Sequence, residues 1–274
     1  MKTSCIVFFL VLLVNVSFAQ VEINGVVKND STSQVIPFAS IGFANKGVGT
    51  ISNERGEFHL TVPNHLRYDT LMFSCIGYKT KGVLITDFRD DSLVRLAEKT
   101  FQLEAVSVSP TKIASKGREK ERGIIVLLSS QKSGETLSGK EVGMVFSNRK
   151  KICLREINFF VYGHTFDEAI LRVNIYEAKR SGVDERINKQ ELFVTLTDKE
   201  SGLVNISLNE DIIFNKRDFI ISVELLKVTP TLGEFALVAG FKPLGKRAVV
   251  RDVSFGEWKK QPLNLSINVN YDVF

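Results

Sequence analysis

The sequence predicts an all-β protein built from two sandwich domains, a seven-stranded one followed by a larger one of jelly-roll type. Most patterned segments alternate apolar and polar residues with a period of two. These segments are short and rich in β-branched and aromatic residues, and Gly, Pro, Asn and Asp separate them at close intervals. No long segment has the period of an amphipathic helix. Antiparallel sandwiches are therefore the expected architecture.

The first 19 residues are expected to form a secretory signal peptide. Lys2 precedes nine consecutive apolar residues from Ile6 to Val14, and Ser17 and Ala19 follow with the small-x-small spacing of a cleavage site. A membrane-spanning helix needs roughly 20 apolar residues, so a retained anchor is the weaker alternative. No later apolar run approaches that length. We therefore predict an exported chain that starts near Gln20 and has no transmembrane segment after cleavage.

The first sandwich is predicted from seven strand-like segments, each bounded by turn-forming residues. They cover residues 21–27, 38–43, 47–52, 56–62, 69–75, 78–86 and 91–96. An eighth run, residues 101–109, leads to Pro110. Residues 111–123 then hold five basic and two acidic side chains but one isoleucine, so they have little apolar surface to bury. We predict a basic linker over residues 110–122.

The second domain, residues 123–274, is predicted to be the larger β-sandwich. Ten segments there have the pattern of strands. They cover residues 123–130, 142–148, 152–162, 169–177, 191–197, 203–209, 218–226, 234–241, 248–255 and 263–271.

Charge and cysteine content limit the function classes. The chain has 36 basic and 31 acidic residues, and removal of Lys2 with the signal peptide leaves 35 minus 31, or +4. This excess is small and dispersed, so we expect no nucleic-acid partner. Cys75 and Cys153 remain after cleavage, each within an apolar run. We expect two separate buried thiols, with a disulfide between them as the alternative in an oxidising compartment.

The sequence contains no complete motif for catalysis or metal binding. The histidines His59, His65 and His164 lack metal-ligand spacing, and no G-x-S-x-G nucleophile elbow occurs. The polar segment from Asn53 to Gly56 lies between two strand-like runs and is interpreted as a hairpin turn rather than a calcium loop, because an arginine sits among its acidic residues. We predict no catalytic residue, no metal and no cofactor.

Acidic residues on separate segments leave a hydrolase open as an alternative, since paired carboxylates usually come from distant strands. The available carboxylates are Glu156, Asp167, Glu168, Asp252 and Glu257.

The only tryptophan, Trp258, is the main candidate for a ligand surface. It lies between turn signals, next to Lys259 and seven residues after Arg251. An exposed indole flanked by polar groups is a typical surface for binding a sugar, whereas a tryptophan that caps the sandwich core is the structural alternative. We take Trp258, Arg251 and Lys259 as a candidate ligand surface.

Three ordered segments in the N-terminal part of the chain form a recognisable signature: "INGVVKNDSTSQVIPFASIGFANKGVGTISNERGEFHLTVP", "DTLMFSCIGYKTKGV" and "LEAVSVSP". Its main positions are Gly25, Pro37, Gly49, Asn53, Gly56, Phe58, Gly77 and Tyr78. This signature resembles the carboxypeptidase-like regulatory domain. The resemblance implies a transthyretin-like, immunoglobulin-like sandwich over residues 20–109, of a kind common in bacterial envelope proteins and without catalytic residues.

From these observations we predict a non-enzymatic exported protein of the cell envelope, periplasmic or associated with the outer membrane. It would act as a binding, interaction or structural module whose partner is an envelope protein or a glycan. One alternative is a glycan-binding module in the C-terminal sandwich, with Trp258 exposed on a groove or loop face. A second alternative is a hydrolase with distant carboxylates.

Overall fold

The structure is a computed structural model, which describes residues 20–89, 92–100, 112–131, 139–179, 182–197, 201–229, 233–241 and 248–274. The signal peptide predicted over residues 1–19 and the strand predicted over residues 101–109 lie outside these residues. Within them the protein is all-β, with two short 3₁₀ turns, η1 (Asn64–Leu66) and η2 (Ile85–Asp87), and no α-helix. No helix in this part of the chain is long and apolar enough to cross a membrane.

The N-terminal domain is a sandwich of two sheets. One sheet has the order β4 (Glu57–Val62), β1 (Val21–Asn29), β7 (Ser92–Leu96). The other has the order β3 (Gly49–Ile51), β2 (Ser40–Gly42), β5 (Thr70–Ser74), β6 (Lys81–Leu84). These seven strands confirm the predicted first sandwich. The expectation of purely antiparallel sheets is wrong for one pair, because β1 and β7 are parallel.

The domain-signature residues shape this sandwich. Gly25 lies in β1 where any Cβ would meet the ring of Phe58 and the backbone of Ser92, so glycine lets the neighbouring strands approach. Phe58 is buried and packs edge-on against Phe73, with ring centroids 5.4 Å apart. Gly77 has φ +86°, a left-handed conformation that glycine adopts without strain.

The segment from Asn53 to Gly56 forms a turn between β3 and β4, as predicted, but this turn is not a hairpin, because β3 and β4 belong to different sheets and do not pair. The Asn53 side-chain oxygen accepts hydrogen bonds from the backbone N–H groups of Arg55 at 2.8 Å and Glu57 at 3.0 Å. Gly56, at φ +72°, closes the turn by donating to the Asn53 carbonyl at 2.9 Å. The side-chain oxygen of Asn53 is therefore used for hydrogen bonds within the turn.

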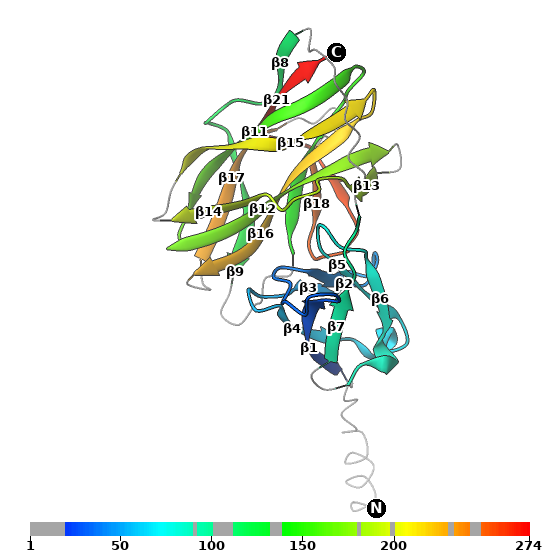
Figure 1. The fold of residues 1–274 in the computed structure, drawn as a ribbon. Coiled ribbons are helices and arrows are strands. Elements are labelled where there is room, and N and C mark those ends of the chain that lie inside the picture. Colours follow the sequence, from blue (N-terminus) through cyan, green and yellow to red (C-terminus); the bar gives the residue numbers. More distant parts are fainter. Residues whose placement is uncertain are drawn as a thin grey trace, which may run out of the picture.

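The C-terminal domain consists of two seven-stranded sheets packed face to face (Figure 1). The first sheet has the order β13 (Gly182–Arg186), β12 (Glu168–Lys179), β16 (Phe219–Thr229), β10 (Glu141–Phe146), β18 (Ala248–Arg251), β19 (Lys259–Gln261), and β14 (Phe193–Thr197) also pairs with β12. The second has the order β20 (Leu263–Leu265), β17 (Gly233–Phe241), β11 (Lys151–His164), β21 (Ile267–Val273), β8 (Lys112–Gly117), while β15 (Gly202–Asn215) pairs with β11 and β9 (Ile124–Gln131) with β17. The two sheets confirm the predicted second sandwich.

The structure corrects the predicted linker and several strand limits. Residues 112–117 are not linker but form β8, which pairs antiparallel with β21. An edge strand of this kind is held by backbone hydrogen bonds to the neighbouring strand, so a segment with few apolar side chains can still form one. The strand predicted over residues 248–255 ends at Arg251, and residues 252–258 form a loop without strand structure. β13 and β19, which carry mostly charged or polar residues, were not predicted.

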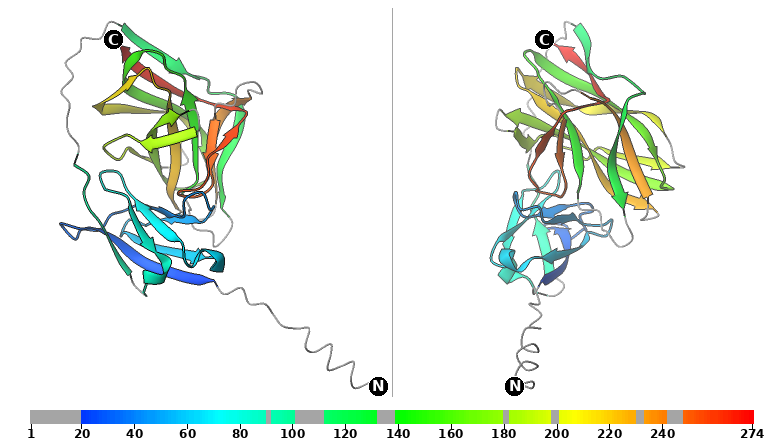
Figure 2. Two further views of the ribbon diagram at one scale, coloured as in Figure 1. Left: turned by 90° about the vertical axis from the view of Figure 1, so that its right-hand side faces the viewer. Right: turned by 180° about the vertical axis from the view of Figure 1, so that it is seen from behind.

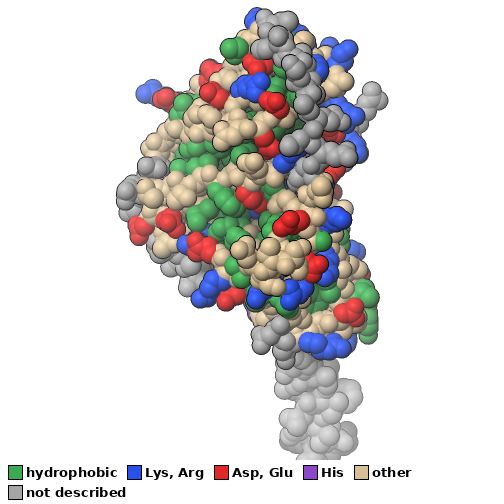
Figure 3. Space-filling model, viewed as in Figure 1, with side chains coloured by type: hydrophobic (Ala, Val, Ile, Leu, Met, Phe, Trp, Pro, Cys, Tyr) green, Lys and Arg blue, Asp and Glu red, His purple; other side chains and the backbone are tan. Residues whose placement is uncertain are grey.

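Each domain has its own hydrophobic core. Residues buried in the first include Ile41, Leu71 and Phe73, and those in the second include Phe159 and Phe219. The N-terminal domain lies against one end of the larger domain, with strands β2, β3 and β5 nearest to it, and the views in Figures 1 and 2 agree on this. Basic and acidic side chains are interspersed over both domains on the face seen in Figure 3.

Candidate functional site at the domain interface

A row of four charged residues crosses the sheet of the C-terminal domain that faces the N-terminal domain. Arg172 on β12 lies opposite Glu224 on β16, Glu224 lies opposite Glu141 on β10, and Glu141 lies opposite Arg251 on β18. The residues one position to either side along these strands, such as Val173 and Val223, point into the sandwich core. The charged row therefore lies on the outer face of the sheet.

Hydrogen bonds and ion pairs hold this row together although it is buried. Arg172 Nη2 lies 2.9 Å from Glu224 Oε2, and Arg251 Nη2 lies 2.5 Å from Glu141 Oε2. The two neighbouring carboxylates would repel each other, but the Asn174 side-chain amide donates to Glu141 at 2.8 Å and to Glu224 at 3.0 Å. The formal charges of the four residues sum to zero.

The electrostatics of the row favour the ionised form of Glu224. Burial alone would raise the pKa of Glu224, but the nearby guanidinium groups of Arg172, Arg251 and Arg186 outweigh it and lower the pKa below its ordinary value. Burial likewise disfavours charge on Arg172, and the carboxylates of Glu224 and Glu191 reverse this and raise the pKa of that arginine. The network thus consists of charged partners that stabilise one another.

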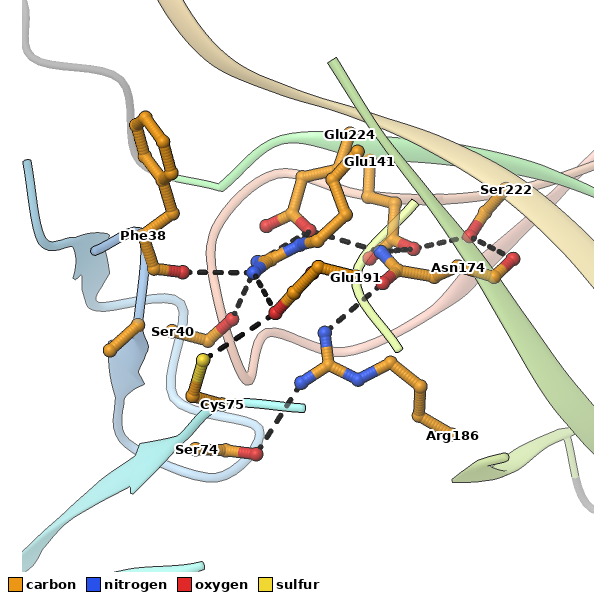
Figure 4. A network of polar contacts seen from close by, with 12 residues as sticks. Phe38, Ser40, Ser74, Cys75, Glu141, Asn174, Arg186, Glu191, Ser222 and Glu224 are labelled. Carbon is orange, nitrogen blue, oxygen red and sulfur yellow. Dashed lines mark hydrogen bonds and ion pairs between the residues drawn. The ribbon is translucent and has the colours of Figure 1, made fainter. Parts of the chain in front are cut away.

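Arg172 also joins the two domains, through Phe38 and Ser40, which are labelled in Figure 4. Its Nη1 donates to the backbone carbonyl of Phe38 at 2.8 Å, and its Nη2 donates to the hydroxyl of Ser40 at 3.1 Å. Beside it, the thiol of Cys75 donates to Glu191 Oε1 at 3.4 Å, and the same carboxylate lies 3.4 Å from Arg172 Nη1. One C-terminal arginine therefore contacts two N-terminal residues directly and a third through Glu191.

Apolar contacts flank the polar network. Phe38 and Ile51 of the N-terminal domain are buried against Leu226, and Ile170 packs at the edge of this cluster. The ring of Phe38 also lies edge-on to Phe193 with centroids 5.6 Å apart. Burial of apolar surface of this kind is the main favourable contribution to docking of two domains.

The backbones of the two domains also meet closely. The carbonyl of Ser254, in the loop of residues 252–258, lies where a Cβ on Gly42 or Gly49 would be. Next to it, the N–H of Asn45 donates to the carbonyl of Phe255 at 2.9 Å. The signature residue Gly49 therefore permits a contact with the other domain.

Unusual backbone conformations gather at this interface. Phe38, Asn45 and Phe255 have φ values of 54°, 57° and 59°, in the left-handed region that bulky residues seldom adopt. The Phe38 carbonyl receives the hydrogen bond from Arg172, and the other two residues bond to each other. Such conformations persist only where surrounding contacts enforce them.

A cavity of about 210 Å³ opens between the domains at one end of this network. Its lining residues are Ser40, Ser74, Tyr176, Arg186, Arg251, Phe255 and Trp258. A second cavity, of about 150 Å³, shares Ser74 and Arg186 with the first. Arg186 thus lies between two hollows of the interface.

The structure brings two of the three predicted ligand-surface residues together. Trp258 is half-buried in the cavity wall, where Arg251 lies 4.8 Å from its ring centroid and Tyr176 packs edge-on at 5.7 Å. Lys259 is exposed, forms an ion pair with Asp252 at 3.1 Å, and is not among the lining residues. A ligand role for these residues stays a prediction.

The carboxylates of the hydrolase alternative do not line these cavities. Glu168 is paired with Lys227 at 3.3 Å and Asp252 with Lys259, while Glu156 accepts a hydrogen bond from Asn270 at 2.7 Å. Within the described part of the chain, no group of three potential metal-ligating side chains occurs. Cys75 and Cys153 are free, separate and buried, which confirms the interpretation of two buried thiols.

The sequence analysis missed Arg172, Glu224, Glu141 and Arg186. The available signal was a charged residue at the middle of a strand-like run, as in "AILRVNIYE" and "DFIISVELL". Strands that are buried on both faces are otherwise nearly continuous in apolar residues, so an interior charge there indicates a buried partner.

Comparison with known proteins agrees with the N-terminal fold. Residues 23–108 match the family model of the CarboxypepD_reg-like domain. The first sandwich is a CarboxypepD_reg-like domain. This confirms the resemblance found in the sequence, and it places the Ser40, Ser74 and Cys75 side of the interface within that domain. No curated protein matches the chain.

The solved structures that match the chain are distant in sequence. The cysteine protease and lectin-like domains of Cwp84, a surface layer associated protein of Clostridium difficile, are 12% identical with a TM-score of 0.42, over 86% of this chain and 58% of that one. The chain therefore spans just over half the length of the Cwp84 structure. The structure of infectious bursal disease virus, Gx strain, is 10% identical with a TM-score of 0.29, over 93% of this chain and 80% of that one. Carbohydrate-binding modules from the β-sandwich superfamily are 10% identical with a TM-score of 0.20, over 88% of this chain and 97% of that one.

Proposed function

We propose that this protein is a non-enzymatic exported binding module of the cell envelope, periplasmic or associated with the outer membrane, that takes its ligand in the cavity between its two domains. The cavity itself is the observation that carries the proposal. It lies between two sandwiches that are held together by the buried Arg172 network, and both domains contribute to its lining. Ligand sites occur preferentially at such domain interfaces.

The composition of the lining supports binding rather than catalysis. Two aromatic rings, Tyr176 and Trp258, provide apolar surface with a polar tip, and Ser40 and Ser74 add hydroxyl groups. The carboxylates behind the wall, Glu141 and Glu224, are engaged by arginines and amides. A carboxylate held in this way is poorly suited to act as a general acid or base.

A glycan is the ligand class that the aromatic wall favours. A ring such as Trp258 offers an apolar face to a sugar, and neighbouring hydroxyl and guanidinium groups offer hydrogen bonds to its oxygens. A cavity of about 210 Å³ is smaller than the roughly 300–1,000 Å³ of sites for drug-sized ligands, so it suits a single sugar residue of a longer chain.

The proposal is tested with the chain from Gln20 to Phe274 on a glycan panel, with calorimetry for each glycan that binds. We expect Trp258→Ala to weaken binding at least tenfold, because it removes the apolar wall of the cavity. Tyr162→Ala is the matched control, since Tyr162 is an exposed aromatic residue of β11 outside the cavity lining. Binding that is equal in wild type and Trp258→Ala would contradict this site. Turnover of a polysaccharide that is lost on replacing one carboxylate would contradict a non-enzymatic role.

A further inference from the structure

We infer that the interdomain cavity selects a saccharide that carries a carboxylate, and that Arg186 binds the carboxylate. This inference rests on the proposed binding function and names the chemical class of its ligand. It depends on the charges in the cavity wall. Of the residues that line the larger cavity, two are arginines and none is acidic. A cationic ligand would be repelled there, whereas an anionic group would be attracted.

Arg251, the first of the two arginines, is already neutralised. Its Nη2 lies 2.5 Å from Glu141 and donates to the Tyr176 hydroxyl at 3.3 Å, and its guanidinium lies over the Trp258 ring. Only its Nε is buried without a partner in the described structure. The charge of Arg251 is thus balanced by Glu141.

Arg186, the second arginine, has neutral partners. Its Nη1 donates to the side-chain oxygen of Asn174 at 3.1 Å, and its Nη2 lies 3.5 Å from the hydroxyl of Ser74 (Figure 4). Among the residues that the structure describes, no carboxylate lies within ion-pair distance of Arg186, whereas Arg172 has both Glu191 and Glu224. A half-buried guanidinium without a counter-ion gains more from an anionic ligand than one that is already paired.

The geometry of the cavity favours a carboxylate on a sugar. A guanidinium is planar and binds a carboxylate through two parallel hydrogen bonds. Trp258 and Tyr176 supply apolar surface for the sugar ring, and Ser40 and Ser74 supply hydroxyl groups for its oxygens. One site therefore combines the anion-binding group with the groups that would hold the remainder of an acidic sugar.

The test compares acidic and neutral sugars of the same ring. Methyl glucuronide and methyl galacturonide are titrated by ligand-observed NMR and calorimetry against methyl glucoside and methyl galactoside, with inorganic phosphate as a competitor. We expect at least one acidic sugar to bind tenfold or more tightly than its neutral counterpart. Arg186→Gln should remove this preference and leave the weaker neutral binding. Arg67→Gln, which removes the same charge from an exposed site whose aromatic contact is Tyr68, should leave the preference intact.

The outcomes separate the inference from the proposed function. If acidic and neutral sugars bind equally well, and Trp258→Ala abolishes the binding of both, the inference is overturned and the proposed function is supported. A preference that persists in Arg186→Gln, or phosphate that competes as strongly as the acidic sugar, would also overturn the inference. No binding of any of these sugars, together with a glycan panel insensitive to Trp258→Ala, would overturn both. Thermal unfolding of each variant shows that it is folded.

Discussion

Arg172 of β12 lies directly opposite Glu224 of β16, with Nη2 2.9 Å from Oε2 and both side chains fully buried. The same guanidinium donates at 2.8 Å to the carbonyl of Phe38 in the other domain. An ion pair within one sheet is therefore also a principal polar contact between the domains. Removal of one partner would leave the other charge buried without compensation.

Arg172→Met is expected to destabilise the protein by about 3–5 kcal/mol, because Glu224 and Glu191 lose their shared cation. Urea unfolding measures the change. The double variant Arg172→Met/Glu224→Met removes both buried charges and should recover a large part of this loss. A single variant within about 0.5 kcal/mol of wild type would show that the pair does not stabilise the fold.

Gly49→Ala is expected to weaken domain docking, since its Cβ would lie 2.5 Å from the backbone carbonyl of Ser254. Overpacking against backbone costs about 1–3 kcal/mol. Small-angle X-ray scattering should show a larger radius of gyration, and proteases should cut between the domains more readily. Gly163→Ala is the control, because nothing lies within 4 Å of its Cβ. Unchanged scattering by Gly49→Ala would contradict a close backbone contact.

The protein should become less stable at low pH, because Glu224 becomes protonated there. Its pKa in the folded state is lowered by Arg172, Arg251 and Arg186 despite burial, below the value of about 4.3 in the unfolded chain. Its contribution is therefore present above about pH 4.3 and lost as the pH falls through the folded pKa. Unfolding temperatures between about pH 2 and 7 should show a shallower acid slope for Glu224→Gln than for wild type.

The control for this slope is Glu257→Gln, which removes an exposed carboxylate from the same domain. It should leave the acid slope as in wild type. Identical slopes for Glu224→Gln and wild type would mean that Glu224 does not carry the expected pH dependence.

Both thiols should resist alkylation in the folded protein. Burial first, and the Glu191 carboxylate second, raise the pKa of Cys75 to about 12, and burial raises that of Cys153 to about 11. Because the thiolate is the reactive form, iodoacetamide at about pH 8 should label neither until the chain unfolds. Mass spectrometry locates the label.

The same experiment reports on docking. Cys75 lies at the interface with Glu191, whereas Cys153 lies within β11. Gly49→Ala should therefore accelerate labelling of Cys75 and leave Cys153 protected. Equal acceleration at both positions would indicate global destabilisation rather than separation of the domains.

Much of the fold could be predicted from local pattern. The period-two segments became β1 to β7 and most strands of the second sandwich, because alternation specifies which side chains face a core. The "NERG" turn was predictable from Asn53 and Gly56, whose backbone requirements are local. The edge strands β8 and β13 were not predicted. β8 depends on β21, a neighbour distant in the sequence. β13 pairs with the preceding strand β12, but it carries mostly charged residues and lacks an apolar alternation.

The sequence alone determined two β-sandwiches and the family of the first, because strand periodicity, turn residues and a domain signature are written along the chain. Only the tertiary structure decided that Arg172, Glu224, Glu141 and Arg251 form one row and that Arg186 and Trp258 share a cavity. Strand register and domain docking set those contacts, and some of them join residues more than a hundred positions apart. A buried arginine needs an acidic partner because of its charge, but strand pairing and domain docking determine which acidic residue lies next to it.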